Sequence, residues 1–372
     1  MISSSYNSLP VNLNGEKIYD IVYDGTFEPL SEFIQEYTSG TRRKICVVSD
    51  SKVASYHMDA ILDIINPICE KVITYVFPEG EQSKNLDTVK ALYVELIENK
   101  FNRNDLLIAL GGGVTGDMCG FAAATYLRGI DFIQIPTSLL ADVDSSIGGK
   151  TGVDFDSYKN MVGAFHMPIM VLINPNTIKT LSQRQFYSGM GEVVKSALIK
   201  NSEFFQWLEE NADKLNDFDY DIVKSIIYEC NLIKKRVVEE DPTETKGERE
   251  LLNFGHTIGH AIEKYMKFEL LHGECVSIGC ILASFISMKK GLIDAKDLER
   301  ITAYIKNNLH IPSMPADINI DEIIKYTKND KKATADYIKF VLIDRIGNAV
   351  VTKDVTDADM KESLEWYMSE IN

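Results

Sequence analysis

The residues best suited to chemistry are three histidines that lie close together in the chain. His256 and His260 are four residues apart, so on a helix they share one face, and His272 follows soon after. The whole chain has six histidines, so half of them fall in this short stretch. Imidazoles with one carboxylate are the ligands that a catalytic Zn²⁺ or Co²⁺ takes, with one position open for substrate. The spacing pairs His256 with His260 as ligands, and Glu192 could supply the carboxylate; hydrogen-bonded histidines of a core are the alternative.

Basic side chains form a second group, because they recur beside glycine, aspartate or histidine motifs. They are Arg128, Lys150, Lys159, Lys195, Lys234, Arg249 and the pair Lys331-Lys332. Each alone would be a solvated surface charge. Together, in a chain of net charge −16, they predict a pocket for a substrate with several negative groups, since guanidinium and ammonium groups bind carboxylate and phosphate. The same net charge argues against a nucleic-acid partner, which requires a basic face.

A glycine-rich turn is placed to bind a cofactor. The apolar run at 106–110 predicts a buried strand, glycines follow at 111–113, and a small-residue segment from Thr115 predicts a helix whose free N–H groups would face a phosphate. Gly111, Gly113 and Gly116 match the dinucleotide fingerprint, but the next strand ends without the acidic residue that holds a ribose. We expect a pyrophosphate-binding turn that differs from an ordinary Rossmann module; a purely structural turn is the alternative.

Two domains must position these residues. Strand-like runs at 44–50, 71–77, 106–110, 130–135 and 170–173, with helices at 53–65 and 86–99, predict an α/β domain with a mostly parallel, Rossmann-like sheet over residues 1–177. Residues 178–372 predict a mainly α-helical domain that binds metal and substrate. Its helices are expected near 182–200, 202–212, 220–238, 249–267, 274–289, 295–307 and 357–369, with a strand pair near 338–343 and 349–352.

Composition narrows the class of protein. The chain has 372 residues, 45% hydrophobic and 25% charged, which is typical of globular proteins and long enough for two domains. No apolar run approaches the length that spans a bilayer, and the N-terminus lacks signal-peptide features, so we expect a cytoplasmic protein with no membrane partner. The six cysteines contain no Cys-x-x-Cys pair and are expected to be reduced.

Taken in order, these motifs resemble the 3-dehydroquinate synthases of the sugar phosphate cyclase superfamily. The resemblance covers more than half of the chain. It is carried by Pro78-Glu-Gly-Glu81, Gly111-Gly-Gly-Val-Thr-Gly-Asp117, Tyr126-Leu-Arg-Gly129, Ile135-Pro-Thr-Ser-Leu-Leu140, Val143-Asp-Ser-Ser-Ile-Gly-Gly-Lys-Thr-Gly152, Lys159-Asn160, Glu192-Val-Val-Lys195, Leu252-Asn-Phe-Gly-His-Thr-Ile-Gly-His260 and His272-Gly-Glu274.

The resemblance implies a role for each candidate residue. Glu192, His256 and His272 would bind Zn²⁺ or Co²⁺, which replaces the pairing of His256 with His260. The residues implied to bind NAD⁺ are Asp50, Glu79, Gly80, Glu81, Gln82, Ser83, Lys84, Gly113, Val114, Thr115, Gly116, Asp117, Thr137, Ser138, Lys150, Lys159, Thr177, Ile178, Lys179 and Thr180. The implied catalytic residues are Lys195, His260, Asn160 and Asp144, and the implied substrate contacts are Arg128, Lys150, Lys234, Arg249 and Asn253, with Lys332 as a further contact.

The implied reaction converts 3-deoxy-D-arabino-heptulosonate 7-phosphate into 3-dehydroquinate and phosphate, through transient NAD-dependent oxidation, phosphate elimination, reduction and intramolecular aldol cyclisation. We expect a homodimer acting on a small anionic sugar phosphate; another sugar phosphate cyclase or an NAD- and metal-dependent polyol dehydrogenase are the alternatives.

Two departures from the family pattern are Tyr158, where glycine is usual, and a segment at 242–248 that is one residue longer. The second leaves open whether Lys234 or Lys235 contacts substrate.

Overall fold

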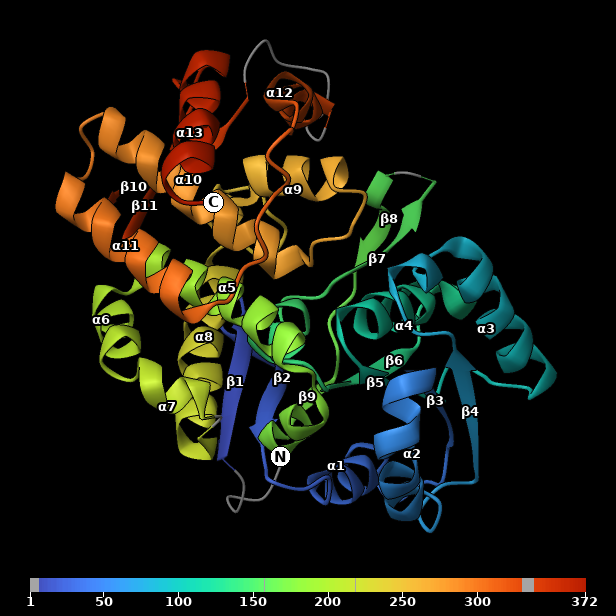
Figure 1. Ribbon diagram of the computed structural model, residues 1–372. Helices are drawn as coiled ribbons and strands as arrows, with labels where there is room; N and C mark the ends of the chain where they lie inside the picture. Colours follow the sequence, from blue (N-terminus) through green and yellow to red (C-terminus); the bar gives the residue numbers. More distant parts are fainter. Residues whose placement is uncertain (1–6, 157, 218, 330–337) are drawn as a thin grey trace. The chain divides into compact units, whose positions relative to one another are not determined.

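The computed structural model describes residues 7–156, 158–217, 219–329 and 338–372 (Figure 1). The chain divides into two units, one comprising Met1–Leu181 with Lys234–Glu239 and the other Ser182–Ile233 with Glu240–Asn372. The first contains the predicted mostly parallel sheet and the second is mainly helical, so the predicted fold class is confirmed.

A seven-stranded sheet forms the centre of the first unit, within the described residues, in the order β1-β2-β9-β6-β5-β3-β4. The five predicted strands are confirmed as β3 (Lys44–Asp50), β4 (Lys71–Phe77), β5 (Leu106–Gly111), β6 (Asp131–Pro136) and β9 (Met170–Ile173), and they run parallel. The antiparallel edge pair β1 (Asn7–Leu13) and β2 (Glu16–Tyr23) was not predicted. Pro10 and a register shift after Val11 interrupt the alternation that identifies a strand.

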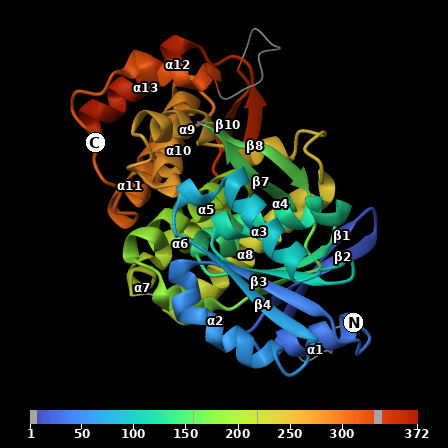
Figure 2. The same ribbon diagram turned by 90° about the vertical axis from the view of Figure 1, so that its right-hand side faces the viewer.

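Both faces of this sheet are covered by helices (Figure 2). Val47 and Ile108 point into a core formed with α1 (Pro29–Tyr37) and α2 (Ser51–Ile65), whereas Val48 and Leu107 point into one formed with α3 (Leu86–Glu98) and α4 (Gly113–Thr125). Because β5 pairs with β3 and not with β4, the direction of winding reverses between β3 and β5. The carboxyl ends of these two strands are therefore the switch point where open α/β sheets bind ligands.

A separate antiparallel hairpin, β7 (Lys150–Phe155) and β8 (Tyr158–Phe165), also belongs to the first unit and was not predicted. Tyr158, which departs from the family pattern, pairs with Phe155 beside the turn, and both side chains are exposed. The hairpin carries Lys159 and Asn160. Short helical turns complete the unit: η1 (Glu81–Ser83), η2 (Tyr126–Arg128), η3 (Ala141–Ser145) and η4 (Pro175–Thr180).

The second unit is built around α10 (His272–Lys289), which is buried continuously from Gly273 to Ser287. A helix that is apolar on all sides belongs in a core, and α10 packs against α5, α9, α11, α13 and β10. The other elements are α5 (Gln183–Lys200), α6 (Ser202–Glu210), α7 (Ala212–Asn216), α8 (Tyr220–Glu240), α9 (His256–Tyr265), α11 (Ala295–Asn308), α12 (Ile320–Asn329), α13 (Asp357–Glu370), β10 (Phe340–Arg345) and β11 (Asn348–Thr352).

The continuous helix predicted over 249–267 is wrong. A short 3₁₀ turn, η5 (Arg249–Asn253), ends before Gly255, and α9 begins at His256. Gly255 is left-handed with φ 76°, and a Cβ there would lie 2.8 Å from the backbone nitrogen of Cys280. Glycine is therefore required both for the turn and for close approach to α10. None of the described helices combines the length and the apolar character needed to cross a membrane.

Candidate active site

The second unit brings Glu192 of α5 beside His272 of α10 because the two helix backbones touch. A Cβ on Gly273 would lie 1.7 Å from the carbonyl oxygen of Ser188, and one on Gly191 would lie 2.3 Å from the carbonyl oxygen of Gly273. Only glycine fits at these two positions. The missing side chains therefore set the distance between the helices that carry Glu192 and His272.

The three predicted histidines converge with Glu192 in the second unit. His256 and His260 share one face of α9, as their spacing predicts, and candidate ligand atoms of His256, His260 and His272 all lie within 4.8 Å of one another. Glu192 Oε1 is 3.5 Å from His256 Nε2 and 3.3 Å from His272 Nε2. His256 and His260, which the spacing pairs, thus lie in one cluster with Glu192 and His272, which the resemblance implies as ligands.

The second ring nitrogen of two of these histidines faces an acceptor. His256 Nδ1 lies 3.0 Å from the carbonyl oxygen of Phe254. His272 Nδ1 lies 3.6 Å from Oε2 of Glu263, a carboxylate on α9 that the sequence analysis did not select. With a cation bound, each ring would keep its proton on Nδ1 and bind through Nε2, which is the form in which imidazole binds metals.

Charge in this cluster is tightly coupled. Lys195 forms an ion pair with Glu192, and both side chains are almost completely buried. Burial opposes ionisation of Glu192, but Lys195 and His256 outweigh it and hold its pKa well below the ordinary value. Burial and Lys195 lower the pKa of His256 to about 3, whereas Glu192 and Glu263 overcome burial and raise the pKa of His272 to about 9. Glu192 is therefore a carboxylate and His256 a neutral imidazole at neutral pH.

These residues fit a divalent cation. Both carboxylate oxygens of Glu192 are buried and accept no hydrogen bond from the part of the chain that the structure describes. Lys195 compensates this buried negative charge on the Oε2 side, while Oε1 faces the two imidazoles and is the oxygen that a metal ion could share with them. One oxygen donor with neighbouring imidazole nitrogens is a set that Zn²⁺ and Co²⁺ accept.

Arg249 and Asn253 lie on η5, directly before the histidine helix. The carboxylate of Asp241 shapes this approach by accepting backbone N–H groups of Thr245 at 2.8 Å, Lys246 at 3.1 Å, Gly247 at 3.1 Å and Arg249 at 3.3 Å. The Arg249 side chain is buried, and its Nη1 donates to the carbonyl oxygen of Pro242 at 2.6 Å. The segment thus holds a guanidinium inside the second unit.

In the first unit the glycine turn follows the carboxyl end of β5, at the switch point of the sheet. Gly112 is the N-cap of α4 and provides no side-chain cap, so the first N–H groups of this helix are open to a ligand. Thr137 N donates to the carbonyl oxygen of Gly111 at 3.1 Å, which places Thr137 and Ser138 beside the turn. The hydroxyls of Thr115 and Thr137 are buried without a hydrogen-bond partner among the described residues.

Lys84 connects several residues implied to bind NAD⁺ with one implied to be catalytic. Its buried ammonium donates to Asp117 and to Asn160, at 2.6 Å each. Burial disfavours this charge, but Asp117 and Glu81 outweigh it and raise the pKa of Lys84. Lys159 lies 3.4 Å from Glu81. The hairpin β7–β8 and the end of β4 are therefore tied together beside the glycine turn.

The other implied cofactor residues lie on short turns of the first unit. Asp50 is the N-cap of α2 and accepts from the N–H groups of Lys52 and Val53, so it has a structural role of its own. Glu79 to Lys84 form η1 and its flanks, and Thr177 to Thr180 belong to η4. His57, which the sequence analysis did not select, lies 3.1 Å from the Thr180 hydroxyl.

Lys234 and Lys235, between which the sequence leaves the substrate contact open, have different partners in the structure. Lys234 Nζ lies 2.5 Å from the carboxylate of Asp144 and 2.6 Å from its carbonyl oxygen, within the first unit. Lys235 is paired instead with Glu239, one turn along α8, at 2.7 Å. Of the two, Lys234 is therefore the one that lies with another predicted site residue. Lys150, at the start of β7, is exposed.

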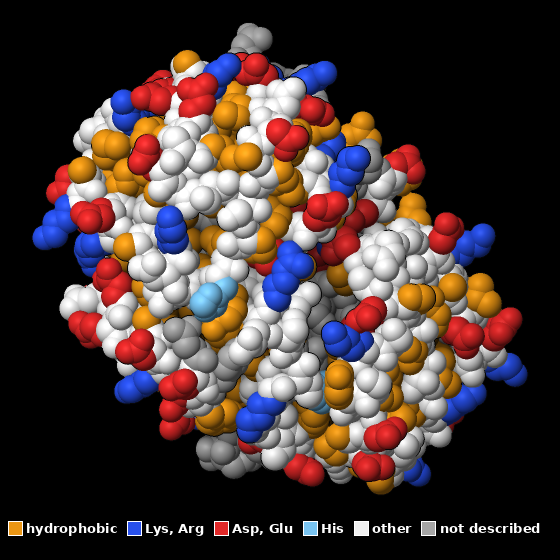
Figure 3. Space-filling model, in the orientation of Figure 1, with side chains coloured by type: hydrophobic (Ala, Val, Ile, Leu, Met, Phe, Trp, Pro, Cys, Tyr) orange, Lys and Arg blue, Asp and Glu red, His pale blue; other side chains and the backbone are white. Residues whose placement is uncertain are grey.

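Not every predicted residue lies with these groups. Arg128 follows the carboxyl end of α4, whereas Asp117 lies near its start; at 1.5 Å per residue the helix extends roughly 12 Å from Asp117 to its last residue, Thr125. Lys331 and Lys332 lie outside the described residues. The face shown in Figure 3 carries interspersed acidic and basic side chains.

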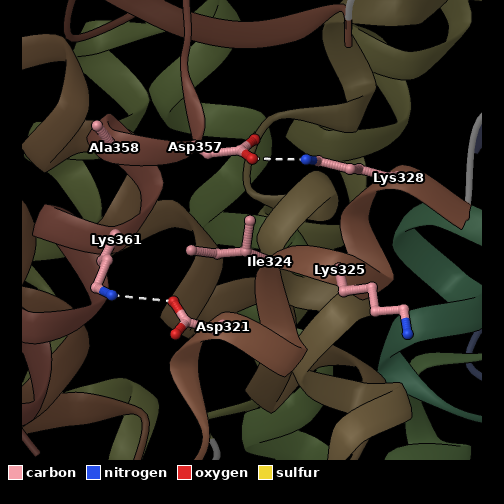
Figure 4. A pocket seen from close by; sticks show the side chains of 7 residues that line it. All are labelled: Asp321, Ile324, Lys325, Lys328, Asp357, Ala358 and Lys361. Carbon is pink, nitrogen blue, oxygen red and sulfur yellow. Dashed lines mark hydrogen bonds and ion pairs between the residues drawn. The ribbon is translucent and has the colours of Figure 1, made fainter.

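A pocket between α12 and α13 contains none of the predicted residues (Figure 4). It is lined by Asp321, Ile324, Lys325, Lys328, Asp357, Ala358 and Lys361. Lys328 pairs with Asp357 at 2.5 Å, and Lys361 pairs with Asp321 at 3.0 Å. Its lining includes neither the clustered histidines with Glu192 nor the glycine turn, so this pocket is not the candidate site.

The fold and the clustered residues place the protein among the sugar phosphate cyclases. A solved structure of 2-deoxy-scyllo-inosose synthase is similar with a TM-score of 0.86 and 26% identity, over 96% of this chain and 99% of that one. ValA, a 2-epi-5-epi-valiolone synthase from Streptomyces hygroscopicus subsp. jinggangensis 5008, has the same TM-score and identity over 98% and 100%. An iron-containing alcohol dehydrogenase, at TM-score 0.67 and 12% identity, shares the fold alone.

Within that class, residues 74–188 match the family described as 3-dehydroquinate synthase N-terminal, and residues 189–333 match 3-dehydroquinate synthase C-terminal. The 3-dehydroquinate synthase of Shewanella halifaxensis is 43% identical over 91% of this chain and 92% of its own. That of Coxiella burnetii is 40% identical over 95% and 98%. The chain belongs to the 3-dehydroquinate synthase family.

Proposed function

We propose that the protein catalyses the reaction of its family, the conversion of 3-deoxy-D-arabino-heptulosonate 7-phosphate into 3-dehydroquinate and phosphate. The observation that carries the proposal is the cluster of Glu192, His256 and His272 beside Lys195, in a chain of this family. Arg249 supports the heptulosonate over sugar phosphates without a carboxylate, because a buried guanidinium forms strong charge-assisted hydrogen bonds with a carboxylate.

Two cofactors are part of this proposal. The inosose synthase structure is described with NAD⁺ and Co²⁺, and ValA with NAD⁺ and Zn²⁺. In this chain Glu192, His256 and His272 would hold the cation, while the turn before α4 and the Lys84 network would hold NAD⁺. When bound, the two cofactors would supply reversible hydride transfer and polarisation of substrate hydroxyls.

The remaining residues bind and orient the substrate. Lys195, His260 and Asn160 would hold its phosphate, so that the phosphate itself can accept the proton lost during elimination. Asn160 is prepared for this role by its left-handed backbone, φ 55°, which Asp154 fixes by accepting its N–H at 2.8 Å. Arg249 and Asn253 would bind the carboxylate, and Asp144 would act with Lys234.

The decisive experiment follows phosphate and NADH together. The purified protein is incubated with the heptulosonate phosphate, NAD⁺ and Co²⁺, and inorganic phosphate, NADH absorbance and 3-dehydroquinate are measured. Phosphate release with 3-dehydroquinate and no net NADH is expected, and Glu192→Gln should abolish both products. Accumulation of NADH without phosphate would instead indicate a polyol dehydrogenase. Turnover only of a sugar phosphate that lacks the carboxylate would indicate another cyclase.

A homodimer is also part of the proposal. Arg128, an implied substrate contact, lies at the far end of α4 from the Lys84 network, so a second copy of the chain is the simplest source of this guanidinium. Mixing inactive Arg128→Ala chains with inactive Glu192→Gln chains should then restore activity, because one site of each mixed dimer has both residues. Failure to restore activity in demonstrated mixed dimers would refute shared sites.

We propose that the enzyme acts in the cytoplasm. Its six cysteines are all buried as free thiols. Free thiols are typical of a reducing compartment.

A further inference from the structure

Glu263 is a buried carboxylate that the proposed reaction does not use. It lies on α9, its side chain is 5% exposed, and its Oε2 is 3.6 Å from His272 Nδ1, within ion-pair range. Carboxylates are seldom fully buried unless a partner compensates the loss of hydration. The position of His272 makes its imidazole such a partner.

The imidazole of His272 lies between two buried carboxylates. Nε2 is 3.3 Å from Glu192 of α5, while Nδ1 faces Glu263 of α9. His272 itself is the first residue of α10. Its ring is in contact with a carboxylate on each nitrogen. A contact on the Nδ1 side therefore has a direct influence on where Nε2 points.

We propose that Glu263 is a positioning residue for metal binding: it holds the proton of His272 on Nδ1 and turns the Nε2 lone pair towards the cation. This inference rests on the proposed metal site. A carboxylate on the outer nitrogen also makes the imidazole a stronger donor, since its negative charge stabilises the positive charge that develops on the ring.

The two proposed imidazole ligands are then held unequally. His256 is oriented by a neutral acceptor, the carbonyl oxygen of Phe254, whereas His272 is oriented by an anion. The carbonyl belongs to the backbone and is retained in every substitution, but the carboxylate can be removed. Glu263 is therefore the Nδ1 acceptor whose role can be tested by mutation.

The test measures metal binding and folding separately from turnover. Glu263→Ala removes the acceptor, and Glu263→Gln keeps a neutral one of the same size. Asp241→Asn is the matched control, because it neutralises another buried carboxylate of the same unit that holds backbone N–H groups instead of a histidine. Glu192→Gln shows how much Zn²⁺ affinity falls when a proposed ligand itself is changed. For each metal-free protein, thermal unfolding, Zn²⁺ affinity by chelator competition and the visible spectrum with Co²⁺ are recorded.

Glu263→Ala is expected to weaken Zn²⁺ binding by about 10- to 100-fold and to change the Co²⁺ spectrum. Glu263→Gln should weaken it less, and Asp241→Asn should lower the unfolding temperature without changing metal affinity. If Glu263→Ala does not fold, Glu263→Gln decides the question through the same affinity and spectrum. Folded Glu263 variants with wild-type affinity and spectrum would overturn the inference. If the wild-type protein binds no divalent cation, or Glu192→Gln binds it equally well, the proposed metal site itself fails.

Discussion

Gly273→Ala should disrupt the candidate metal site by separating two helices. Its new Cβ would lie 1.7 Å from the carbonyl oxygen of Ser188, an atom of the α5 backbone that cannot rotate away. An ordinary contact between carbon and oxygen is about 3.3 Å, so the helices must separate by roughly 1.5 Å. In a helix without such a contact, alanine stabilises by up to about 1 kcal/mol relative to glycine. A loss of stability in Gly273→Ala would therefore indicate a clash between the two helices.

The consequence for metal binding follows from the distance between ligands. Tetrahedral ligands about 2.1 Å from an ion lie about 3.4 Å from each other. Glu192 Oε1 and His272 Nε2 are 3.3 Å apart, and a separation of the helices by roughly 1.5 Å would increase this distance to about 5 Å. We expect Zn²⁺ affinity to fall by about 100-fold or more, because Glu192 and His272 would no longer lie at the distance that a shared ion requires. Overpacking should also cost about 1 to 3 kcal/mol in the free energy of unfolding.

Zn²⁺ affinity by chelator competition and urea unfolding of the metal-free protein test this expectation. Ser188→Gly is the matched control, because it removes the nearby hydroxyl but leaves the carbonyl in place. The double variant Ser188→Gly/Gly273→Ala should therefore remain as impaired as Gly273→Ala. Full rescue in the double variant would show that only the side chains clash, and unchanged affinity in Gly273→Ala would refute the argument that this contact sets the site.

Three further outcomes are expected. Arg249→Ala should lower kcat/KM for the heptulosonate phosphate by roughly 30- to 5,000-fold, which corresponds to about 2 to 5 kcal/mol for an unpaired buried charge, and unchanged kinetics would place the carboxylate elsewhere. Lys84→Met should weaken NAD⁺ binding in calorimetry while Zn²⁺ affinity stays constant, because its ion pair with Asp117 lies in the first unit. Asp241 has a folded-state pKa below its ordinary value because backbone N–H groups of Lys246 and Thr245 overcome the effect of burial. Its stabilisation is therefore present above the unfolded pKa of about 3.9 and is lost as pH falls through the folded value, so the destabilisation by Asp241→Asn in urea unfolding should be full at pH 7 and should decrease progressively as pH is lowered below about 3.9.

The parts of the fold that can be predicted are those in which the buried positions carry apolar side chains in a regular pattern. The strand Leu106–Gly111 is buried at every position, because helices cover both faces of the sheet, and it therefore appears as a continuous apolar run. The hairpin β7–β8 is different. Several of its apolar side chains, including Phe155, Tyr158 and Met161, are exposed, so neither alternation nor continuous burial identifies it.

The parts of the site that the residues alone could not predict depend on glycine. Helix periodicity finds neighbours on one helix, which is how His256 and His260 were paired. The approach of Glu192 to His272 depends on Gly191 and Gly273, whose role is to have no side chain, and this gives no periodic signal. Periodicity gives no signal for Glu263 either, because its partner His272 lies on another helix.

The distances also bear on which two of the three imidazoles accompany Glu192. A tetrahedral ion requires ligand atoms about 3.4 Å apart, and Glu192 Oε1 lies 3.5 Å from His256 Nε2 and 3.3 Å from His272 Nε2. Spacing along α9 favours His260 as the partner of His256, but a shared helix face fixes only the direction of the rings and not the distance between their nitrogens. A carboxylate that meets two imidazoles at tetrahedral distances is a more specific criterion. It favours the proposed set of Glu192, His256 and His272, in which His260 would instead donate to the substrate phosphate.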